Sequence, residues 1–107
     1  MSYNVYATPP FKKAAKNLSK KYPQLKTDIR NLTDSLKSNP LQGDALGKDC
    51  YKIRMQITGK NAGKSKGARV IINVQIIRTE VYLLTIYDKS DRSDLLSGEL
   101  DKLLKYL

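Results

Sequence analysis

The chain has 107 residues, of which 20 are Lys or Arg and 10 are Asp or Glu, so its formal net charge at pH 7 is +10. This length suits a single domain over residues 1–107 and is too short for two domains of ordinary size. A positive surplus this large costs folding stability through self-repulsion, so it indicates an acidic partner such as nucleic acid, an anionic membrane or an acidic protein.

Several classes of site are disfavoured by residues that the sequence lacks. It has no His, the commonest acid–base and metal-binding side chain. Cys50 is the only cysteine, which excludes an internal disulfide and is typical of a small buried hydrophobe. No apolar run approaches the ~18 residues of a membrane span, and the N-terminus lacks the order of a secretion signal. We therefore expect a cytoplasmic protein with no metal, no cofactor and no membrane partner.

The N-terminal half reads as one strand and two helices. Residues 3–7 alternate as a short strand does, and Thr8-Pro9 is typical of a helix start. Apolar residues then recur at helical spacing in two stripes: Phe11, Ala14, Ala15 and Leu18, followed by Leu25, Ile29, Leu32 and Leu36. Pro23 separates the stripes, so we predict an antiparallel helical hairpin lying on a sheet. The lysines around these stripes are interpreted as the solvated side, with phosphate binding as the alternative.

The stretch from Tyr51 to Arg69 combines a strand pattern, a glycine-rich loop and a purely cationic charge set. It contains six cations and no Asp or Glu: Lys52, Arg54, Lys60, Lys64, Lys66 and Arg69. Residues 51–58 and 68–77 alternate between apolar and polar, which predicts two antiparallel strands. Residues 41–49, which precede them, read as a loop.

The register of these two strands is constrained by their apolar residues, because a slip of one residue would turn one apolar set to the opposite face. We predict that residue 57 faces 70, 55 faces 72 and 53 faces 74, or a shift of these by two. Arg54 then shares a face with Arg69 and Asn73, with the two arginines ~13 Å apart at the backbone. Their long side chains could hold one phosphodiester. The alternative is that the basic residues form only the solvated face of the sheet, and Ile71 interrupts this polar face.

The C-terminal third reads as a strand, a charged segment and a short helix. Residues 81–87 are almost all apolar, as in a strand that is covered on both faces or lies mid-sheet. After the charged segment 88–93, Ser97 can cap a helix with apolar positions at Leu100, Leu103, Leu104 and Leu107. The predicted fold is α+β in two layers, an antiparallel sheet with the helical hairpin on one face, in the order β-α-α-β-β-β-α. The other face is expected to be an open basic concavity.

Three stretches of the sequence resemble the RelE/ParE superfamily of bacterial toxins, above all its RelE and HigB-like branches. They are CYKIR at 50–54, GKSKGARVI at 63–71 and YLLTIYDKSDRSDL at 82–95. The resemblance implies the toxin of a type II toxin–antitoxin module, neutralised by a cognate antitoxin protein. In RelE and HigB-like members it further implies cleavage of mRNA on the ribosome without a metal, by attack of the RNA 2'-hydroxyl on the adjacent phosphate.

The resemblance also implies site residues. Its basic catalytic positions correspond to Lys52, Arg54, Arg69 and Lys89. Further RNA-binding candidates are Lys60, Lys64, Lys66, Asn73 and Arg92. Two positions depart from the RelE pattern: Ser90 stands where RelE toxins have an arginine, and Leu96 where they have a catalytic tyrosine. We interpret these departures as marking a different branch of the superfamily.

Cleavage of this kind needs a base for the 2'-proton, stabilisation of the phosphate charge and an acid for the leaving 5'-oxygen. Two cations ~6 Å apart repel by ~3 kcal/mol at an effective dielectric of ~20, which lowers a lysine pKa by ~2 units. Crowding can therefore make Lys52, Lys64 or Lys66 the base, with Asp88 as a rival.

The remaining roles follow from side-chain geometry. Arg54 and Arg69 are expected to clamp the phosphate through their planar forks, and Lys89 or Tyr87 to act near the leaving group. Tyr87 has an alternative reading as a core aromatic.

Two other functions remain open. ParE toxins share the superfamily and inhibit DNA gyrase, although the basic residues on one sheet face favour a nuclease. A plain nucleic-acid-binding module usually interleaves basic residues with exposed aromatics, and the loop 59–67 has none. The expected partners are thus the antitoxin and mRNA on the ribosome, including rRNA. We expect the antitoxin to bury the basic face or displace the C-terminal helix.

Overall fold

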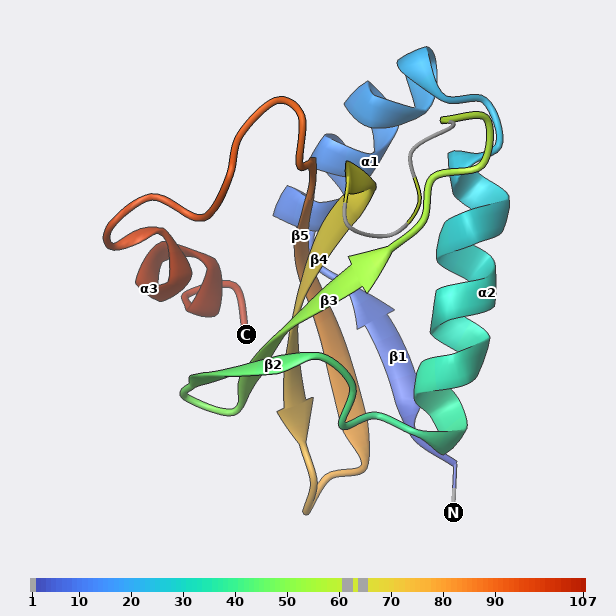
Figure 1. Ribbon diagram of the computed structural model, residues 1–107. Helices are drawn as coiled ribbons and strands as arrows, with labels where there is room; N and C mark the ends of the chain where they lie inside the picture. Colours follow the sequence, from blue (N-terminus) through green and yellow to red (C-terminus); the bar gives the residue numbers. More distant parts are fainter. Residues whose placement is uncertain (1, 61–62, 64–65) are drawn as a thin grey trace.

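A five-stranded mixed sheet separates two helices from a third in the computed structural model (Figure 1), which describes residues 2–60, 63 and 66–107. In chain order the elements are β1 Asn4–Ala7, α1 Pro9–Lys21, α2 Leu25–Ser38, β2 Asp44–Gly47, β3 Cys50–Met55, β4 Ala68–Gln75, β5 Glu80–Asp88 and α3 Glu99–Leu104. The strands lie side by side in the order β1-β5-β4-β3-β2. None of the helices in the described ranges is long and apolar enough to span a membrane.

The α+β class and the predicted order of elements are confirmed, with two differences in detail. Residues 44–47, predicted as part of a loop, form the short edge strand β2 beside β3. The sheet is also not wholly antiparallel, because β1 runs parallel to β5. Thr8 helps to fix this pairing: its backbone N–H and its hydroxyl both donate to the carbonyl of Leu83, at 3.1 and 2.9 Å. Thr8 is the N-cap residue of α1, as the sequence predicted, but its hydroxyl makes no capping hydrogen bond to the helix.

β4 is buried on both of its faces, and seven of its eight residues are buried. Toward α1 and α2, Val70 and Ile72 join the larger core with Phe11 and Leu25. Toward α3, Ile71 is 0% exposed and packs in a second, smaller cluster with side chains of β5 and α3. The predicted open basic face is therefore wrong over this part of the sheet, because the leucines of α3 need an apolar surface to cover.

β3 and β4 turn the predicted residues toward the same face, but the residues that pair across the two strands differ from the prediction. Ile53 faces Val70 and Arg54 faces Arg69, four positions away from the predicted partners. β3 ends at Met55, and the following residues turn toward α2, where Asp28 accepts hydrogen bonds from the backbone N–H and the hydroxyl of Thr58 at 2.8 and 2.5 Å. As a result Arg54 and Arg69 are direct cross-strand partners rather than ~13 Å apart.

Because Gly43 has no side chain, the start of β2 can lie close to the backbone of β3. It has φ +87°, and a Cβ atom there would overlap the backbone carbonyl of Lys52, whereas Gly47 has φ +82° with nothing within 4 Å of that position. Gly47→Ala should therefore cost only backbone strain, roughly 1 kcal/mol. Gly43→Ala should lower the free energy of unfolding by about 1–3 kcal/mol more, because it adds a clash. Urea denaturation measures both, and equal losses would contradict the close approach of the two strands.

Candidate nucleic-acid interface

A row of three side chains crosses the sheet on the face that carries α3. Arg69 on β4 is the cross-strand partner of Arg54 on β3 and of Tyr87 on β5. Arg54 is exposed, whereas Arg69 is 5% exposed and donates from Nη1 to the carbonyl of Ala68 at 3.2 Å. Lys52 lies two residues before Arg54 and therefore points to the same face. The structure thus brings together four of the five predicted catalytic residues.

The segment 89–98, which connects β5 to α3, contacts Tyr87 at one end of this row and Lys52 beside the other. Asp94 Oδ1 is 3.4 Å from Lys52 Nζ and accepts a hydrogen bond from the Leu95 N–H at 2.8 Å. The Leu95 hydrogen bond lowers the pKa of Asp94, burial opposes this, and Lys52 lowers the pKa further. Lys89, the fifth predicted catalytic residue, donates from Nζ to the carbonyl of Ser93 at 2.8 Å, within the segment itself.

The Arg92 side chain links this segment to both β5 and α3. Its guanidinium makes two parallel hydrogen bonds to Glu99, at 2.7 and 2.9 Å, and lies 4.5 Å from the centre of the Tyr87 ring. The hydrogen bonds from Arg92 lower the pKa of Glu99, with burial opposing them. Arg92, predicted to bind RNA, therefore binds Glu99 and Tyr87 of its own chain in this conformation.

Tyr87 packs as the core aromatic that was one of its two predicted readings. It is 6% exposed and packs in the smaller core with Ile71 and Leu103, as a core aromatic does. Its hydroxyl, however, is buried and has no hydrogen-bond partner among the residues that the structure describes. An unpaired buried hydroxyl costs about 1–3 kcal/mol. Burial raises the pKa of Tyr87, and nearby Asp94 raises it further, so the hydroxyl keeps its proton at neutral pH.

Asp88 lies at the end of β5 but belongs to a different cluster. It is 1% exposed and accepts hydrogen bonds from Lys60 Nζ at 2.5 Å, the Tyr22 hydroxyl at 2.8 Å and the Ser90 N–H at 2.9 Å. Burial raises the pKa of Asp88, but these hydrogen bonds lower it by more, to about 2. Asp88 is therefore a weak base whose oxygens are occupied, which argues against the rival-base reading. Lys60, predicted to bind RNA, is held in this cluster by Asp88 and by Ser90 Oγ at 2.6 Å.

The remaining predicted residues are dispersed. Asn73 is 2% exposed, and its amide donates to the carbonyl of Lys48 at 3.1 Å, so it supports the β2–β3 turn from the interior. Lys66 is exposed just before β4, and Lys64 lies outside the described residues. Cys50 is 1% exposed, which confirms its reading as a buried hydrophobe. In the described ranges, no group of three or more His, Cys, Asp or Glu side chains is arranged to hold a metal ion.

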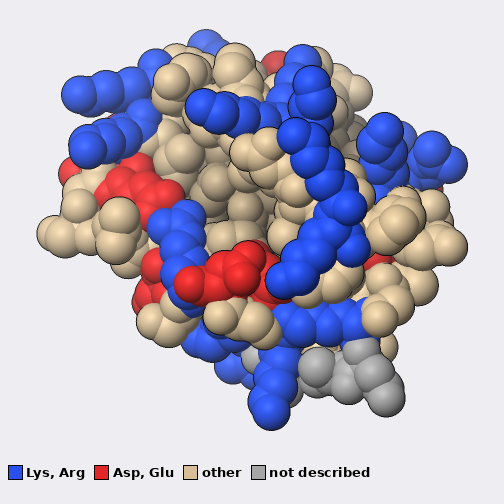
Figure 2. All heavy atoms as spheres, turned by 90° about the horizontal axis from the view of Figure 1, so that it is seen from above, with Lys and Arg blue, Asp and Glu red and all other residues tan. Residues whose placement is uncertain are grey.

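Seen end-on, this part of the molecule mixes both signs of charge. Figure 2 shows Lys and Arg side chains around a hollow, with Asp and Glu side chains between them. The acids that sequence reasoning missed are Asp94 and Glu99, which come from the segment after β5 and the start of α3. The only indication of these two acids in the sequence was the charged segment 88–93, which directly follows the apolar residues of β5 and precedes both acids. Beside the arginine row, Lys52 and Arg92 are thus each paired with one of the chain's own carboxylates.

Comparison with known proteins identifies the architecture. No protein-family model matches the sequence. A mutant of the E. coli toxin RelE, solved in its free state, superposes with a TM-score of 0.59 at 16% identity, over 99% of this chain and 94% of that one. The chain has the RelE fold. The toxin–antitoxin complex RelBE2 from Mycobacterium tuberculosis gives a TM-score of 0.61 at 15% identity, over 88% of this chain and 95% of that chain.

In this RelE-fold chain, the Asp88 cluster makes a pH-dependent contribution to stability. The folded-state pKa of Asp88 is about 2 against an ordinary value of 3.8. Its ionised form therefore stabilises the fold fully above pH 4, and this stabilisation is lost as the pH falls through about 2. Asp88→Asn should lower the free energy of unfolding at pH 7 by roughly 2 kcal/mol. Urea denaturation at pH 7, 4 and 2 should show the gap between variant and wild type closing toward pH 2.

Tyr22→Phe is the control for this prediction, because it removes one hydrogen bond and keeps the carboxylate. It should cost roughly 1 kcal/mol and retain most of the acid-range loss of stability. A gap between Asp88→Asn and wild type that stays constant from pH 7 to pH 2 would contradict the assignment.

Proposed function

We propose that this chain is the toxin of a type II toxin–antitoxin module and that it cuts mRNA on the ribosome without a metal. The single observation that carries the proposal is the cross-strand row of Arg54, Arg69 and Tyr87, with Lys52 on the same face. The RelE fold supports it, since the neighbours described above are a toxin and a toxin–antitoxin complex. The antitoxin and ribosome-bound mRNA are the proposed partners, in the cytoplasm.

The two arginines suit the phosphate that reacts. As direct partners in an antiparallel pair, their backbones lie only ~4.5–5.5 Å apart, so both guanidinium groups can reach one phosphate. A phosphate held between two guanidinium groups is attracted by both. The attraction is greatest when negative charge grows on the phosphate oxygens, as it does when the 2'-hydroxyl attacks.

The proton transfers are assigned to the flanking residues. Tyr87 is protonated at neutral pH, as any tyrosine is, and its hydroxyl has no partner among the described residues, so it is free to donate to the leaving 5'-oxygen. Lys52 stands on the same sheet face and is the proposed base. Lys89 is bonded to the carbonyl of Ser93, which leaves Tyr87 as the better candidate near the leaving group.

Substrate entry requires the segment 89–98 to move. Arg69 is 5% exposed and Tyr87 is 6% exposed, so a phosphate reaches them only after the neighbouring surface opens. The Asp94 carboxylate also stands beside Lys52, where a phosphate would bind. In the proposed mechanism RNA therefore replaces Asp94 as the partner of Lys52.

Loss of an arginine from the row should abolish activity. Arg54→Ala and Arg69→Ala should each lower mRNA cleavage about 100-fold or more, because each removes a donor to the developing charge, and neither should arrest growth on induction. Arg78→Ala, at an exposed side chain in the β4–β5 turn, is the matched control and should retain full toxicity.

The readouts are growth after induction and mapping of mRNA ends by primer extension. Arg54 is exposed, so its variant tests the role even where replacement of buried Arg69 perturbs folding. Growth arrest by Arg54→Ala as complete as that of wild type would refute the proposal. Gyrase-dependent DNA damage with intact mRNA would instead favour a ParE-like activity.

Removal of the Asp94 carboxylate, which competes with RNA for Lys52, should strengthen RNA binding. Asp94→Asn should increase affinity for a 2'-deoxy-substituted, uncleavable RNA by about two- to fivefold, the value of an exposed ion pair. Asp101→Asn makes the same charge change on α3, where Asp101 pairs with Lys48, and should increase the RNA affinity by less. Fluorescence anisotropy at fixed salt measures both, and equal gains would show that only net charge matters.

A further inference from the structure

Two adjoining hollows lie along the outer edge of β3, beside Arg54. Their volumes are about 290 and about 250 Å³, and Gln42, Ile53 and Arg54 line both of them. β2 pairs with β3 only as far as Lys52, so from Ile53 onward no strand of the described chain pairs with this edge. The two edge hollows therefore continue the row that begins at Tyr87 on β5, beyond its last member, Arg54.

Three amide side chains line the larger edge hollow: Asn31 from α2, Gln42 from the α2–β2 connection and Gln56 from the end of β3. Asn31 and Gln56 have no side-chain hydrogen bond to any other described residue. The described lining also holds one cation and one acid, Asp28, whose carboxylate is already occupied by Thr58. Since an amide offers both donors and an acceptor without charge, this hollow suits an uncharged polar ligand.

Gln42 is held in one orientation. Its Nε2 group donates to Ser35 Oγ and to the carbonyl of Asn39, both at 2.7 Å. Because a carbonyl oxygen can only accept, the Asn39 contact fixes the NH₂ end of the amide against the protein. Gln42 Oε1 is left as an acceptor with no donor among the described residues. The larger edge hollow therefore favours a ligand that carries a hydrogen-bond donor.

The smaller edge hollow has a different chemistry. Lys52, Arg54 and Asp44 line it, so its cations outnumber its acids by one. Arg54 forms no ion pair within the described ranges. Uncharged amides and cations thus lie next to each other at this edge, as the base and the phosphate do in a nucleotide.

We infer that the larger edge hollow binds a nucleobase that carries an exocyclic amino group, beside the phosphate bound by Arg54 and Arg69. Asn and Gln amides recognise the edges of bases, and a base of single-stranded RNA can turn outward into such a site. The amino group of adenine, cytosine or guanine would donate to Gln42 Oε1, whereas uracil has no amino group. The inference rests on the proposed function and deepens it, because it assigns a base preference to the RNA site.

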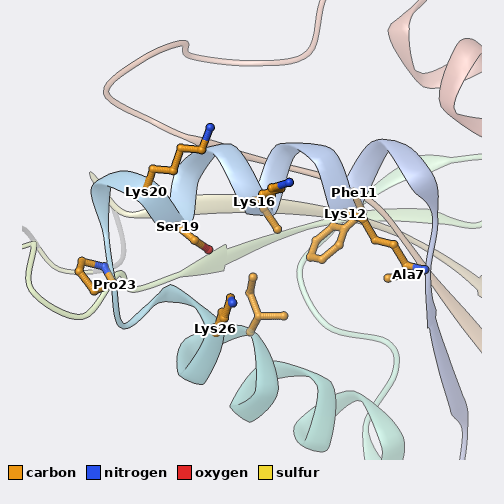
Figure 3. Close-up of a pocket in the computed structure, with 10 residues that line it drawn as sticks. Ala7, Phe11, Lys12, Lys16, Ser19, Lys20, Pro23 and Lys26 are labelled. Carbon is orange, nitrogen blue, oxygen red and sulfur yellow. The ribbon is translucent and has the colours of Figure 1, made fainter.

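A cavity of about 660 Å³ between α1 and α2 (Figure 3) is less suited to a base. It lies on the other side of the sheet, where Phe11 belongs to the larger core and Tyr87 does not. No Asn or Gln is among the described residues that line it. Figure 3 shows Phe11 projecting into the space between the helices, but this side chain is 4% exposed and is not presented for stacking. The edge of β3 is therefore the better place for base recognition.

The test compares two trinucleotides, one of cytidines and one of uridines, both 2'-deoxy-substituted so that they are not cleaved. The two probes match in charge and ring size and differ where cytosine has an amino group and uracil an oxygen. NMR titration of the full chain should show the cytidine probe binding about three- to tenfold more tightly, the value of one hydrogen bond. The side-chain amide signals of Gln42 and Gln56 should shift on binding. Gln42→Leu should bring the two affinities within about twofold of each other.

Gln24→Leu is the matched control, since Gln24 is exposed and lines neither edge hollow. This variant should keep the preference for cytidine. Equal affinities of wild type for the two probes, a preference that survives Gln42→Leu, or no binding of either probe would overturn the inference. Equal affinities that both fall in Arg54→Ala would leave the phosphate site standing without the base site. A chain that prefers cytidine but cuts no mRNA would instead end the proposed function and leave the base site intact.

Discussion

The structure depends on β4 being covered on both faces. Its residues alternate between the core beneath α1 and α2 and the smaller cluster beneath α3, so neither face can be left to solvent. α3 must therefore lie on the opposite side of the sheet from the helical hairpin. The chain reaches that side through residues 89–98, which bring Arg92 to Tyr87 and Asp94 to Lys52, next to Arg54 and Arg69. The packing of an apolar strand thus decides what lies over the charged residues.

The same arrangement explains how so basic a chain tolerates its charge. Ten acids oppose twenty cations, and three of those acids stand where cations are crowded: Asp88 with Lys60, Asp94 with Lys52 and Glu99 with Arg92. These pairs relieve self-repulsion in the unbound state. The buried Asp88 pair ties the end of β5 to Lys60 and Tyr22, whereas the Asp94 pair is exposed and weak. In the proposed mechanism, RNA replaces Asp94 as the partner of Lys52 and leaves the Asp88 cluster in place.

Local patterns predicted the elements, and long-range contacts decided the site. Stripes such as Phe11 to Leu18 predicted α1 and α2, and strand alternation predicted which face Arg54 shares with Arg69. Alternation does not fix alignment, however, and the hydrogen bonds from Thr58 to Asp28 ended β3 earlier than its pattern suggested. The burial of Asn73 and the pairing of Asp94 with Lys52 depend on residues far away in sequence, which no local spacing reveals.

The central claim is that RNA binds at the arginine row and displaces the segment 89–98. An NMR titration of the chain with a short, 2'-deoxy-substituted RNA tests it directly. The account predicts that the amide signals of Arg54, Arg69, Tyr87 and residues 89–98 shift together, while those along α1 change little. Shifts confined to the lysines of α1, with residues 89–98 unperturbed, would contradict it.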